Sequence, residues 1–582
     1  MILRSMKIRI DHKVFSAVLI LTVLASCDAL GQDSQQYEDP YLLRLADQVN
    51  SDIEDLCGIY NIVTGTNSAS VRNGKEIKEL NIWEHLYTDD EFPLFMVDYI
   101  SGEFYWTLNG DKLSPVGDGT VVPSVKISGG EWYYSYGDDS VWKKVKTGEK
   151  SDPGLMKIKD ETDLFYSLVF PSGYSVVLLT KKGVQATKKD VPLKSFYNDV
   201  FLDAGIGLIS RNFLYAARYL GLGLECVSYS SVADTVVQNP ILGGSEIDLN
   251  GRLLYPDGQP RYRMLFVDGG NSREHGEYLG TRSREMMRTF IKNGGVYVGT
   301  CAGAFFVSNG YDDHEDYKYY LNMFPGIIKH SKLVSIYTGV TIPEDSPLLR
   351  YYDFGGDGYV NKVHHNKGGY LVNPPTGAEI LGFFDYPSKT NLHGQPCVWA
   401  YKYDDYTGRI VATGSHPEEN NSGEVRDLAA AMMQYALDGQ GYTEVKGLLQ
   451  KGVARVMDKS TSDNYPAFAR IGDKQTHHFA FIIPEGNSNV TISLKSDVDC
   501  DMALMIDKDT YAYEEDAHYV QDSEGSVKTM SFEKLEPGLW FLGVKCNTTV
   551  DSVDLKYGQA YSGRTDVLNG VPYSVVVDWE TE

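Results

Sequence analysis

The middle of the chain alternates short apolar runs with segments of helical periodicity. Residues 264–267 and 296–299 are apolar runs typical of buried strands, and the segment between them carries apolar residues at helical spacing. Residues 409–412 form a further strand-like run, which a second helical pattern follows. Because strands that alternate with helices favour parallel pairing, we predict an α/β domain with a mainly parallel sheet over residues 189–440.

The segments on either side have a different pattern. Before the α/β region, aromatic and apolar residues fill 103–108 and 131–136, and Asn109-Gly110 directly after the first run is typical of a tight hairpin. After it, apolar runs such as 478–483 and 573–577 are typical of a β-sandwich. We therefore predict a multi-domain chain in which the α/β domain is flanked by an N-terminal β module and a C-terminal β-sandwich.

The N-terminus has the composition of a targeting signal. Several basic residues precede a nearly continuous apolar run over residues 14–24, which is shorter than the roughly 20 residues needed to span a bilayer. The run leads into Ala25-Ser26-Cys27, and small residues before a cysteine resemble the signal of bacterial lipoproteins. By this resemblance Cys27 is lipidated and anchors the mature chain to a membrane of the bacterial cell envelope, outside the cytoplasm. The alternative is an ordinary cleaved secretory signal with an incidental Cys27.

Changes of pattern divide the chain into successive segments. A polar stretch after the signal is interpreted as a tether, and apolar residues at mostly helical spacing over 41–60 predict a short amphipathic helix. The predicted boundaries are a lipoprotein signal peptide over 1–27, the tether and helix over 28–80, an aromatic-rich β module over 81–188, the α/β domain over 189–440, a linker over 441–465 and the β-sandwich over 466–582.

Composition narrows the classes of function. The 582 residues are more than one hydrophobic core usually serves. The 54 Lys+Arg against 79 Asp+Glu give a net charge of −25, which disfavours binding to the phosphates of nucleic acids. Seven cysteines are too few for a disulfide scaffold, so each is interpreted singly. Cys500 and Cys546 either pair across the predicted sandwich or remain free thiols.

The most informative motif spans residues 298–304, where small residues surround Cys301. This cysteine follows a predicted buried strand and precedes an apolar helical stretch, which is the arrangement of a nucleophile elbow. Glycines suit such a turn because side chains there would collide with the neighbouring strand. The helix N-terminus favours the thiolate, the reactive form of cysteine. The alternative is a buried structural cysteine in a glycine-rich turn.

Two other places along the chain fit the same chemistry. His416 and Glu418 follow the last predicted strand of the α/β domain, and their spacing puts both side chains on one side of an extended turn. The histidine can then accept the thiol proton while the glutamate orients the imidazole. Gly269 and Gly270 follow the strand at 264–267, where backbone N–H groups can bind a developing oxyanion.

The order of these motifs resembles that of class I glutamine amidotransferase-like domains, and the fold that this implies is flavodoxin-like. The Cys-Ala-Gly-Ala sequence at the elbow resembles in particular the N-terminal domain of biotin-protein ligase. The resemblance implies that Cys301 is the nucleophile, His416 the base and Glu418 the orienting acid. It also implies an oxyanion hole formed by the amides of Gly270 and Ala302.

The same resemblance predicts that Gly269, Asn271 and Phe305 line the substrate pocket. Phe305 stands where glutaminases of this family carry a glutamine that helps to hold the substrate. We therefore expect the substrate to be a small molecule or peptide with an amide or related acyl bond, and not glutamine. No cofactor, metal or nucleic-acid partner is expected. The alternative function is a non-catalytic surface protein that uses the same fold as a scaffold for a ligand or partner.

Other residues carry weaker signals. His364 and His365 are adjacent on a predicted strand and so face opposite ways, which disfavours a shared metal ion. His275 is expected at the mouth of the pocket or on the surface, and the acidic residues of 507–516 are interpreted as a solvated face. Motifs within residues 499–541 resemble the bacterial pre-peptidase C-terminal domain, which implies an accessory role.

Overall fold

The structure is a computed structural model in which the described residues form two compact units. The first unit holds the described residues up to Val145 together with Phe170–Tyr174, and the second holds all the others from Lys157 onward. The predicted signal peptide with Cys27 lies outside the described residues. No described helix is long and apolar enough to cross a membrane. The described residues are 46–56 without 48, 52 and 55, then 93–117, 122–136, 141–145, 157–160, 162–204, 214–227, 238–463, 465–555 and 558–581.

The first unit contains two antiparallel three-stranded sheets, and its described residues within 46–56 are helical, as predicted. The Asn-Gly dipeptide makes the predicted hairpin: Asn109 and Gly110 have φ angles of 52° and 87° and join strands in which Leu108 pairs with Asp111. Two positive φ angles in succession give the twist that matches the flanking strands. The strands are β1 (Phe95–Ile100), β2 (Glu103–Leu108), β3 (Asp111–Pro115), β4 (Pro123–Ser128), β5 (Glu131–Tyr136) and β6 (Lys143–Lys144).

A nine-stranded sheet forms the centre of the α/β domain, in the order β11-β10-β12-β13-β22-β21-β20-β17-β18. Parallel pairs join β11 through β22, and antiparallel pairs join the remaining strands. The predicted mainly parallel sheet is thus found in part. Between residues 308 and 422 the described chain has no α-helix, and parallel strands need a long crossover connection. The strands are β10 (Asn198–Asp203), β11 (Leu224–Val227), β12 (Tyr262–Val267), β13 (Val296–Thr300), β17 (Ile336–Thr341), β18 (Tyr359–His365), β20 (Glu379–Asp385), β21 (Pro396–Tyr401) and β22 (Ile410–Thr413).

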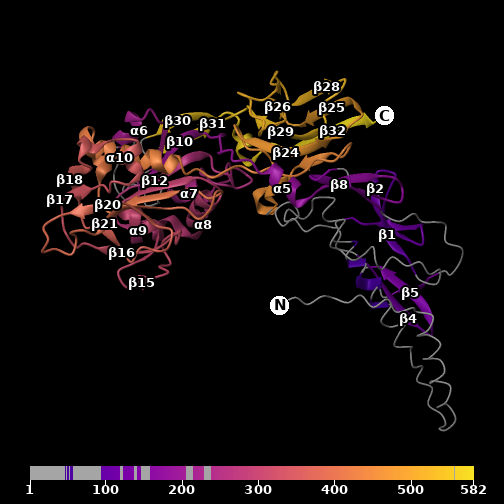
Figure 1. Ribbon diagram of the computed structural model, residues 1–582, viewed down its shortest axis with the longest axis horizontal. Coiled ribbons are helices and arrows are strands. Elements are labelled where there is room, and N and C mark those ends of the chain that lie inside the picture. Colours follow the sequence, from indigo (N-terminus) through magenta and orange to yellow (C-terminus); the bar gives the residue numbers. More distant parts are fainter. Residues whose placement is uncertain are drawn as a thin grey trace, which may run out of the picture. The chain divides into compact units, whose positions relative to one another are not determined.

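Helices cover both faces of this sheet (Figure 1). Phe266 and Val298 are buried with α6 (Tyr215–Tyr219) and α10 (Gly423–Leu437), whereas Leu265 and Tyr297 are buried with α8. Successive residues of a strand point to opposite faces, so each strand contributes to both cores. The other helices are α7 (Gln238–Gly243), α8 (Ser272–Lys292) and α9 (Ala302–Val307), and a four-stranded side sheet consists of β14 (Ser308–Tyr311), β15 (His314–Glu315), β16 (Phe324–His330) and β19 (Gly369–Val372).

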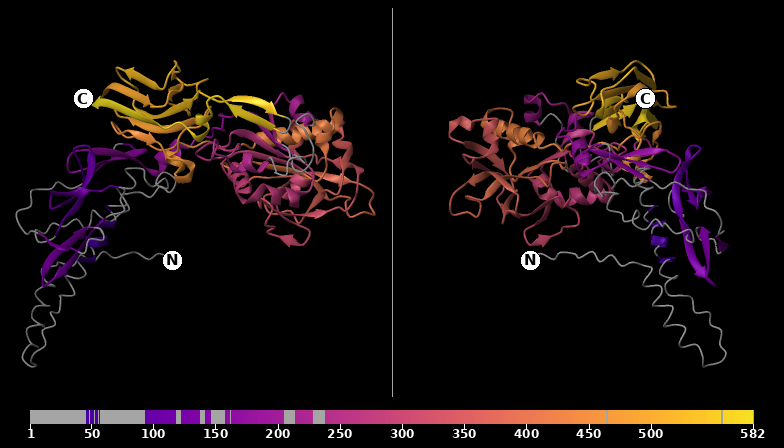
Figure 2. Two further views of the ribbon diagram at one scale, coloured as in Figure 1. Left: turned by 180° about the vertical axis from the view of Figure 1, so that it is seen from behind. Right: turned by 45° about the vertical axis from the view of Figure 1, so that its right-hand side comes forward.

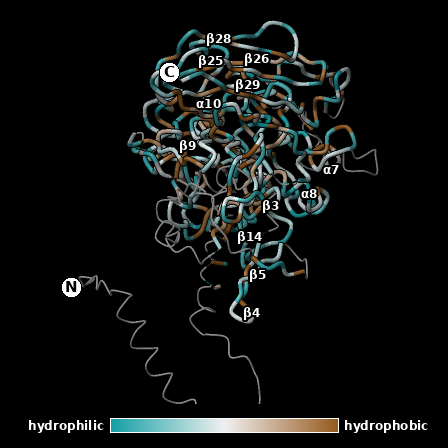
Figure 3. Tube along the Cα trace, turned by 90° about the vertical axis from the view of Figure 1, so that its right-hand side faces the viewer, coloured by the Kyte–Doolittle hydropathy of each residue, from teal (hydrophilic) through white to brown (hydrophobic). Residues whose placement is uncertain are grey.

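The C-terminal region is a sandwich of two antiparallel four-stranded sheets, as predicted, with orders β23-β32-β25-β28 and β24-β29-β26-β27. Alternate residues of β25 are buried, among them Val490, Ile492 and Leu494. Figure 3 colours the chain by hydropathy and shows hydrophilic and hydrophobic residues mixed along the strands of the sandwich. The strands are β23 (Arg455–Met457), β24 (Thr476–Ile483), β25 (Asn487–Lys495), β26 (Met502–Asp507), β27 (Tyr519–Gln521), β28 (Val527–Phe532), β29 (Gly538–Cys546) and β32 (Tyr573–Thr581), and the second unit also holds β7 (Lys157–Asp160), β8 (Phe165–Val169), β9 (Ser175–Leu179) and α5 (Lys181–Thr187).

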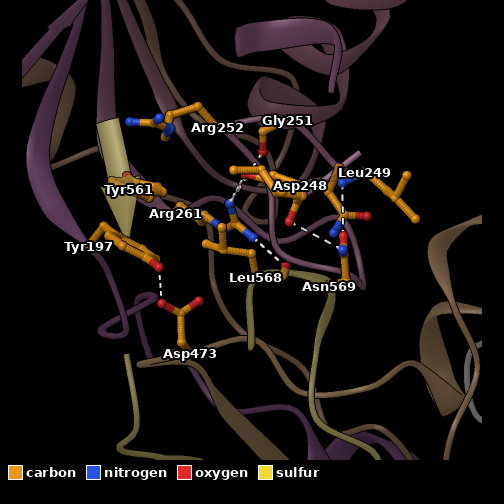
Figure 4. A network of polar contacts seen from close by, with 12 residues as sticks. Tyr197, Asp248, Leu249, Gly251, Arg252, Arg261, Asp473, Tyr561, Leu568 and Asn569 are labelled. Carbon is orange, nitrogen blue, oxygen red and sulfur yellow. Dashed lines mark hydrogen bonds and ion pairs between the residues drawn. The ribbon is translucent and has the colours of Figure 1, made fainter. Parts of the chain in front are cut away.

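A buried polar network joins the sandwich to the α/β domain. The hairpin of β30 (Asp551–Leu555) and β31 (Gly558–Ser562) lies beside edge strand β11 of the central sheet (Figures 1 and 2). Arg261 is fully buried, and its guanidinium donates to Asp248 at 2.6 Å and to the carbonyl of Leu568 at 2.8 Å (Figure 4). The sandwich thus supplies an acceptor to a charge buried in the α/β domain.

The segment predicted as a linker, 441–465, is hydrogen-bonded to its neighbours. The N–H of Lys446 donates to the carbonyl of His478 at 2.6 Å, and that of Leu449 donates to the carbonyl of Ala480 at 2.8 Å. These bonds attach the segment to β24 of the sandwich. It is therefore part of the packed second unit.

Candidate active site

Cys301 stands on a strained turn between β13, whose residues are all buried, and α9. Its φ is 45° and its ψ is −101°, a left-handed backbone that non-glycine residues rarely adopt. The turn is tight because glycines flank it: a Cβ at Gly303 would collide with the carbonyl oxygen of Val267, and one at Gly299 would meet the backbone of Gly303. The predicted elbow geometry is present at this cysteine.

The end of the neighbouring strand brings a histidine and a glutamate to the same place. The N–H of Cys301 donates to the carbonyl of Thr413 at 2.9 Å, because β13 and β22 are parallel neighbours. His416 follows three residues later, and its Nδ1 lies 2.9 Å from Oε1 of Glu418. Both side chains are buried. Carboxyl ends of parallel strands meet at one edge of a sheet, which is where such folds hold ligands.

Contacts with Gly269 show how closely the cysteine and the histidine lie. A Cβ at Gly269 would be 2.5 Å from Cε1 of His416 and 3.6 Å from Cβ of Cys301. Burial by itself would lower the pKa of His416, but the charge of Glu418 and hydrogen bonds to Cys301 and Glu418 raise this pKa to about 12. The arrangement therefore holds an imidazolium beside the sulfur.

The predicted oxyanion donors are the N–H groups of Gly270 and Ala302. Gly270 has a φ of 133° and is exposed, and Ala302 is the first residue of α9. Within the described residues, neither of these two N–H groups has a hydrogen-bond acceptor. Asn271 is the N-cap of α8, where its side chain accepts a hydrogen bond from the N–H of Glu274 at 3.3 Å. The structure therefore gives Asn271 a helix-capping contact at the rim of the site.

Phe305 is placed in the core behind the elbow. Only 4% of its surface is exposed, and its ring stacks on His330 with ring centres 4.4 Å apart. The ring also packs against Gly369, where a Cβ would lie 2.8 Å from Cζ of the phenylalanine. Little of the ring is left to contact a substrate, so the expectation that Phe305 lines the substrate pocket is wrong.

The two adjacent histidines point to opposite sides of β18, as predicted. His364 Nδ1 lies 2.8 Å from Oε2 of Glu419, and its ring centre is 5.4 Å from that of His416. His365 is fully buried, with Nε2 2.7 Å from the hydroxyl of Ser331. The sequence pattern shows the alternation but not the partner of either ring, so the contact of His364 and Glu419 with the candidate base was not predicted.

Two further side chains near the pair were also missed. Thr300 and Asp268 directly precede Cys301 and the glycine pair, and adjacency to the motifs is the signal that could have found them. The hydroxyl of Thr300 lies 3.0 Å from Oε1 of Glu418 and 3.3 Å from Oδ1 of Asp268. Both residues are buried.

His275 is neither at a pocket mouth nor on the surface, so that expectation is wrong. It is 3% exposed, and Nε2 lies 2.8 Å from Oδ2 of Asp203, the last residue of β10. The first turn of a long amphipathic helix carries one face inward, and His275 lies on that face of α8.

Two sets of side chains have the composition of metal ligands. One set is Asp268, His416 and Glu418, whose ligand atoms all lie within 4.8 Å of one another. The hydrogen bond between His416 and Glu418 by itself explains why these two side chains lie so close together. The other set includes Asp507, which is buried and accepts hydrogen bonds from the N–H groups of Asp509 and Thr510 at 2.8 and 3.0 Å. Asp507 therefore stabilises a turn, and the interpretation of this stretch as a solvated acidic face is wrong for Asp507, whereas Asp509, Glu515 and Asp516 are exposed.

Comparison with known proteins bears on the elbow segment. Residues 257–329 match the family model described as biotin-protein ligase, N terminal. This segment resembles that family. It includes Gly269, Gly270, Cys301, Ala302 and Phe305, whereas the histidine and glutamate lie beyond its end. The comparison supports a likeness of this segment to the N-terminal domain of biotin-protein ligase, within a strand-rich, multi-domain chain.

Several solved structures are similar to parts of the chain at low identity. A structure titled glutamine amidotransferase is 14% identical and covers 41% of this chain and 98% of its own, with a TM-score of 0.27. A putative ThuA-like protein from Parabacteroides merdae is 16% identical and covers 43% of this chain and 92% of its own, with a TM-score of 0.26. The pre-peptidase C-terminal domain of a collagenase from Bacillus anthracis is 12% identical and covers 23% of this chain and 98% of its own, with a TM-score of 0.14. No curated protein matches the chain.

Proposed function

We propose that the α/β domain is a cysteine hydrolase or acyl transferase that acts on an amide or related acyl bond. The observation that carries this proposal is the setting of Cys301, a thiol on a left-handed turn beside a histidine that a buried glutamate orients. A purely structural cysteine needs neither the turn nor the charge pair. Nucleophile, base and orienting acid in this arrangement serve acyl transfer on several unrelated folds.

The reaction begins when the sulfur of Cys301 attacks the carbonyl carbon of the substrate. The carbonyl π electrons move to oxygen, and the N–H groups of Gly270 and Ala302 donate hydrogen bonds to the oxyanion that forms. The tetrahedral intermediate then expels the leaving group, which takes the proton held by His416, and a thioester remains on Cys301. In hydrolysis, His416 takes a proton from water as the water oxygen attacks the thioester, and collapse releases the acid and the thiolate. In transfer, another nucleophile takes the place of water.

The charge of the histidine favours a thiolate that is already formed before the substrate binds. Because the pKa of His416 is raised to about 12, its imidazole holds a proton at neutral pH. A neighbouring imidazolium stabilises the thiolate form of a cysteine. The same proton is then available to the leaving group.

Glutamine is excluded from this proposal as the substrate. The position of the family glutamine is filled by Phe305, whose ring is buried against His330 and offers no hydrogen bond. A site that recognises a polar group by hydrogen bonds loses much of its discrimination when one partner is removed. The substrate is therefore another small molecule or peptide with an acyl bond.

The proposal places this chemistry in the bacterial cell envelope. Its support is the N-terminal sequence, in which a basic start and a short apolar run lead to Ala25-Ser26-Cys27. A lipid on Cys27 attaches the chain to a membrane outside the cytoplasm. The substrate is then a compound present in that compartment.

A substrate screen tests the proposal against its rival, a non-catalytic binding scaffold. The full chain is incubated with peptide, amide and ester substrates, beside Cys301→Ala and the matched control Cys226→Ala. We expect turnover in the wild type and in the control, and none in Cys301→Ala. Ligand binding that is equal in wild type and Cys301→Ala, without turnover of any class, would support the scaffold.

A further inference from the structure

Two buried carboxyl groups lie together behind the candidate catalytic histidine. Asp268 follows β12 and is 2% exposed, and Glu418 is 3% exposed. One oxygen of each carboxyl group and one ring nitrogen of His416 all lie within 4.8 Å of one another. The mechanism above uses Glu418 and leaves Asp268 without a role.

The hydrogen-bond donors around these two groups are too few for two carboxylates. Oε1 of Glu418 lies 2.9 Å from Nδ1 of His416 and 3.0 Å from the hydroxyl of Thr300. Oδ1 of Asp268 accepts from the N–H of Gly269 at 2.6 Å and lies 3.3 Å from the same hydroxyl. A hydroxyl has one proton, so Thr300 donates to only one of the two acids at a time.

The second oxygen of Glu418 shows where a donor is missing. Oε2 is buried and has no hydrogen-bond partner among the described residues. Buried charged acceptors are normally hydrogen-bonded, and two ionised carboxylates this close in a buried site repel each other. A proton on Asp268 removes the repulsion and supplies a donor at once.

We propose that Asp268 is a positioning residue that carries a proton in the resting protein and donates it in a hydrogen bond to Glu418. The two acids then share a single negative charge behind His416. The idea deepens the proposed function, on which its catalytic meaning rests. Burial and the charge of Glu418 both raise the pKa of Asp268 well above its usual value, which agrees with this assignment.

The shared proton determines the total charge of Asp268 and Glu418, the two acids beside His416. With Asp268 neutral, one carboxylate balances one imidazolium, and Glu418 gains a donor beside His416 and Thr300. If Asp268 ionises at high pH, a second negative charge appears in the cluster and repels the negative charge that the sulfur carries during its attack. The titratable groups that face this cluster are Cys301 from the elbow, His416, Glu418 and Glu419 from the turn after β22, and His364 and His365 from β18. The neighbouring strand β10 ends in Asp203, which pairs with His275 of α8 and accepts a backbone hydrogen bond from Asp268.

Alkylation of Cys301 by iodoacetamide, followed by mass spectrometry of the full chain over a range of pH, tests the proposal without any substrate. Asp268→Asn keeps a hydrogen-bond donor toward Glu418 but cannot ionise. We expect its rate to stay within about threefold of the wild type near neutral pH and to lack the decline that the wild type shows at alkaline pH. Asp268→Ala removes the donor toward Glu418 altogether, and we expect a loss of about tenfold.

An infrared spectrum provides a second measurement that is independent of the cysteine. At neutral pH the difference between wild type and Asp268→Asn should contain the carbonyl stretch of a protonated carboxyl group. Its absence would overturn the proposal even if both variants fold, as judged by near-ultraviolet circular dichroism. An Asp268→Asn rate as low as that of Asp268→Ala would also overturn it, because an ionised Asp268 would then be required.

Divalent metal ions provide the remaining alternative for the same cluster. If zinc added to the wild type slowed the alkylation, and Asp268→Asn abolished this effect, the cluster would be a metal site and the shared proton would be excluded. If the infrared band is present while Cys301 proves inert, the proton assignment stands and the proposed enzyme function fails. The two failures are therefore distinguishable.

Discussion

The Nδ1 atom of His416 lies 2.9 Å from Oε1 of Glu418, two residues further along the same turn. This short sequence separation means that the candidate base and its candidate orienting acid are positioned together by one piece of backbone. The candidate nucleophile, Cys301, comes from more than a hundred residues earlier and reaches them because β13 and β22 are parallel neighbours. The charge of the pair leads to a first prediction about stability.

The charged histidine should stabilise the folded chain more at low pH than at high pH. The pKa of His416 is about 12 in the folded state against about 6.5 when unfolded, so the contribution is complete below pH 6.5 and declines as pH rises toward 12. In urea unfolding, the free-energy advantage of the wild type over His416→Gln should shrink between pH 6.5 and 9, by up to about 1.4 kcal/mol per pH unit. An advantage that is constant or grows with pH would contradict a protonated imidazole.

The buried arginine at the edge of the α/β domain should be needed for stability. Arg261→Ala leaves Asp248 buried without its partner, which typically costs about 3–5 kcal/mol. The matched control is Arg564→Ala, which breaks the exposed pair with Asp566 and should cost less than about 1 kcal/mol. Urea denaturation of the two variants measures both values. Equal, small losses would show that the network does not hold the α/β domain and the sandwich together.

Much of the fold and part of the candidate site follow from local sequence. A two-residue hairpin turn requires two positive φ angles, which Asn109-Gly110 adopts readily. The glycines around Cys301 permit close approach of helix and strand. Both features could therefore be predicted from a few residues. Their physical causes are local.

The missed features depend on contacts across the fold. The antiparallel half of the sheet follows from connections without helices, and the contact of His364 with Glu419 joins a strand to a distant turn. The burial of Phe305 against His330 depends on a side sheet that the pattern did not predict. The catalytic roles of Cys301, His416 and Glu418 remain predictions, because the structure shows only that these side chains lie close together.

The chain should not release ammonia from glutamine. Phe305 offers no hydrogen bond at the position where the glutaminases that the elbow resembles carry a glutamine, and an unpaired buried polar group costs about 1–3 kcal/mol. Incubation of the full chain with glutamine, followed by an ammonia assay, should give the same background as Cys301→Ala. Ammonia released at an ordinary enzymatic rate, and only with Cys301 present, would show that another residue replaces the missing contact.

Cys27 should carry the lipid anchor. Cells that express the chain and are labelled with a fatty acid should incorporate the label into the wild type and not into Cys27→Ser. The change affects only the residue that follows Ala25-Ser26 and leaves the apolar run intact. Equal labelling of both proteins would point to the alternative of an ordinary cleaved signal.

The most direct test of the central claim is the formation of an acyl-enzyme on Cys301. The full chain is mixed with an activated acetyl ester at neutral pH, quenched, digested and analysed by mass spectrometry. We predict that Cys301 is acetylated before any other described cysteine, including Cys397, which is fully buried and whose thiol pKa is raised by burial. The adduct should be lost again in water, and His416→Ala should slow its formation at least tenfold. A Cys301 that stays unmodified until the chain is unfolded would contradict the account and favour a binding scaffold.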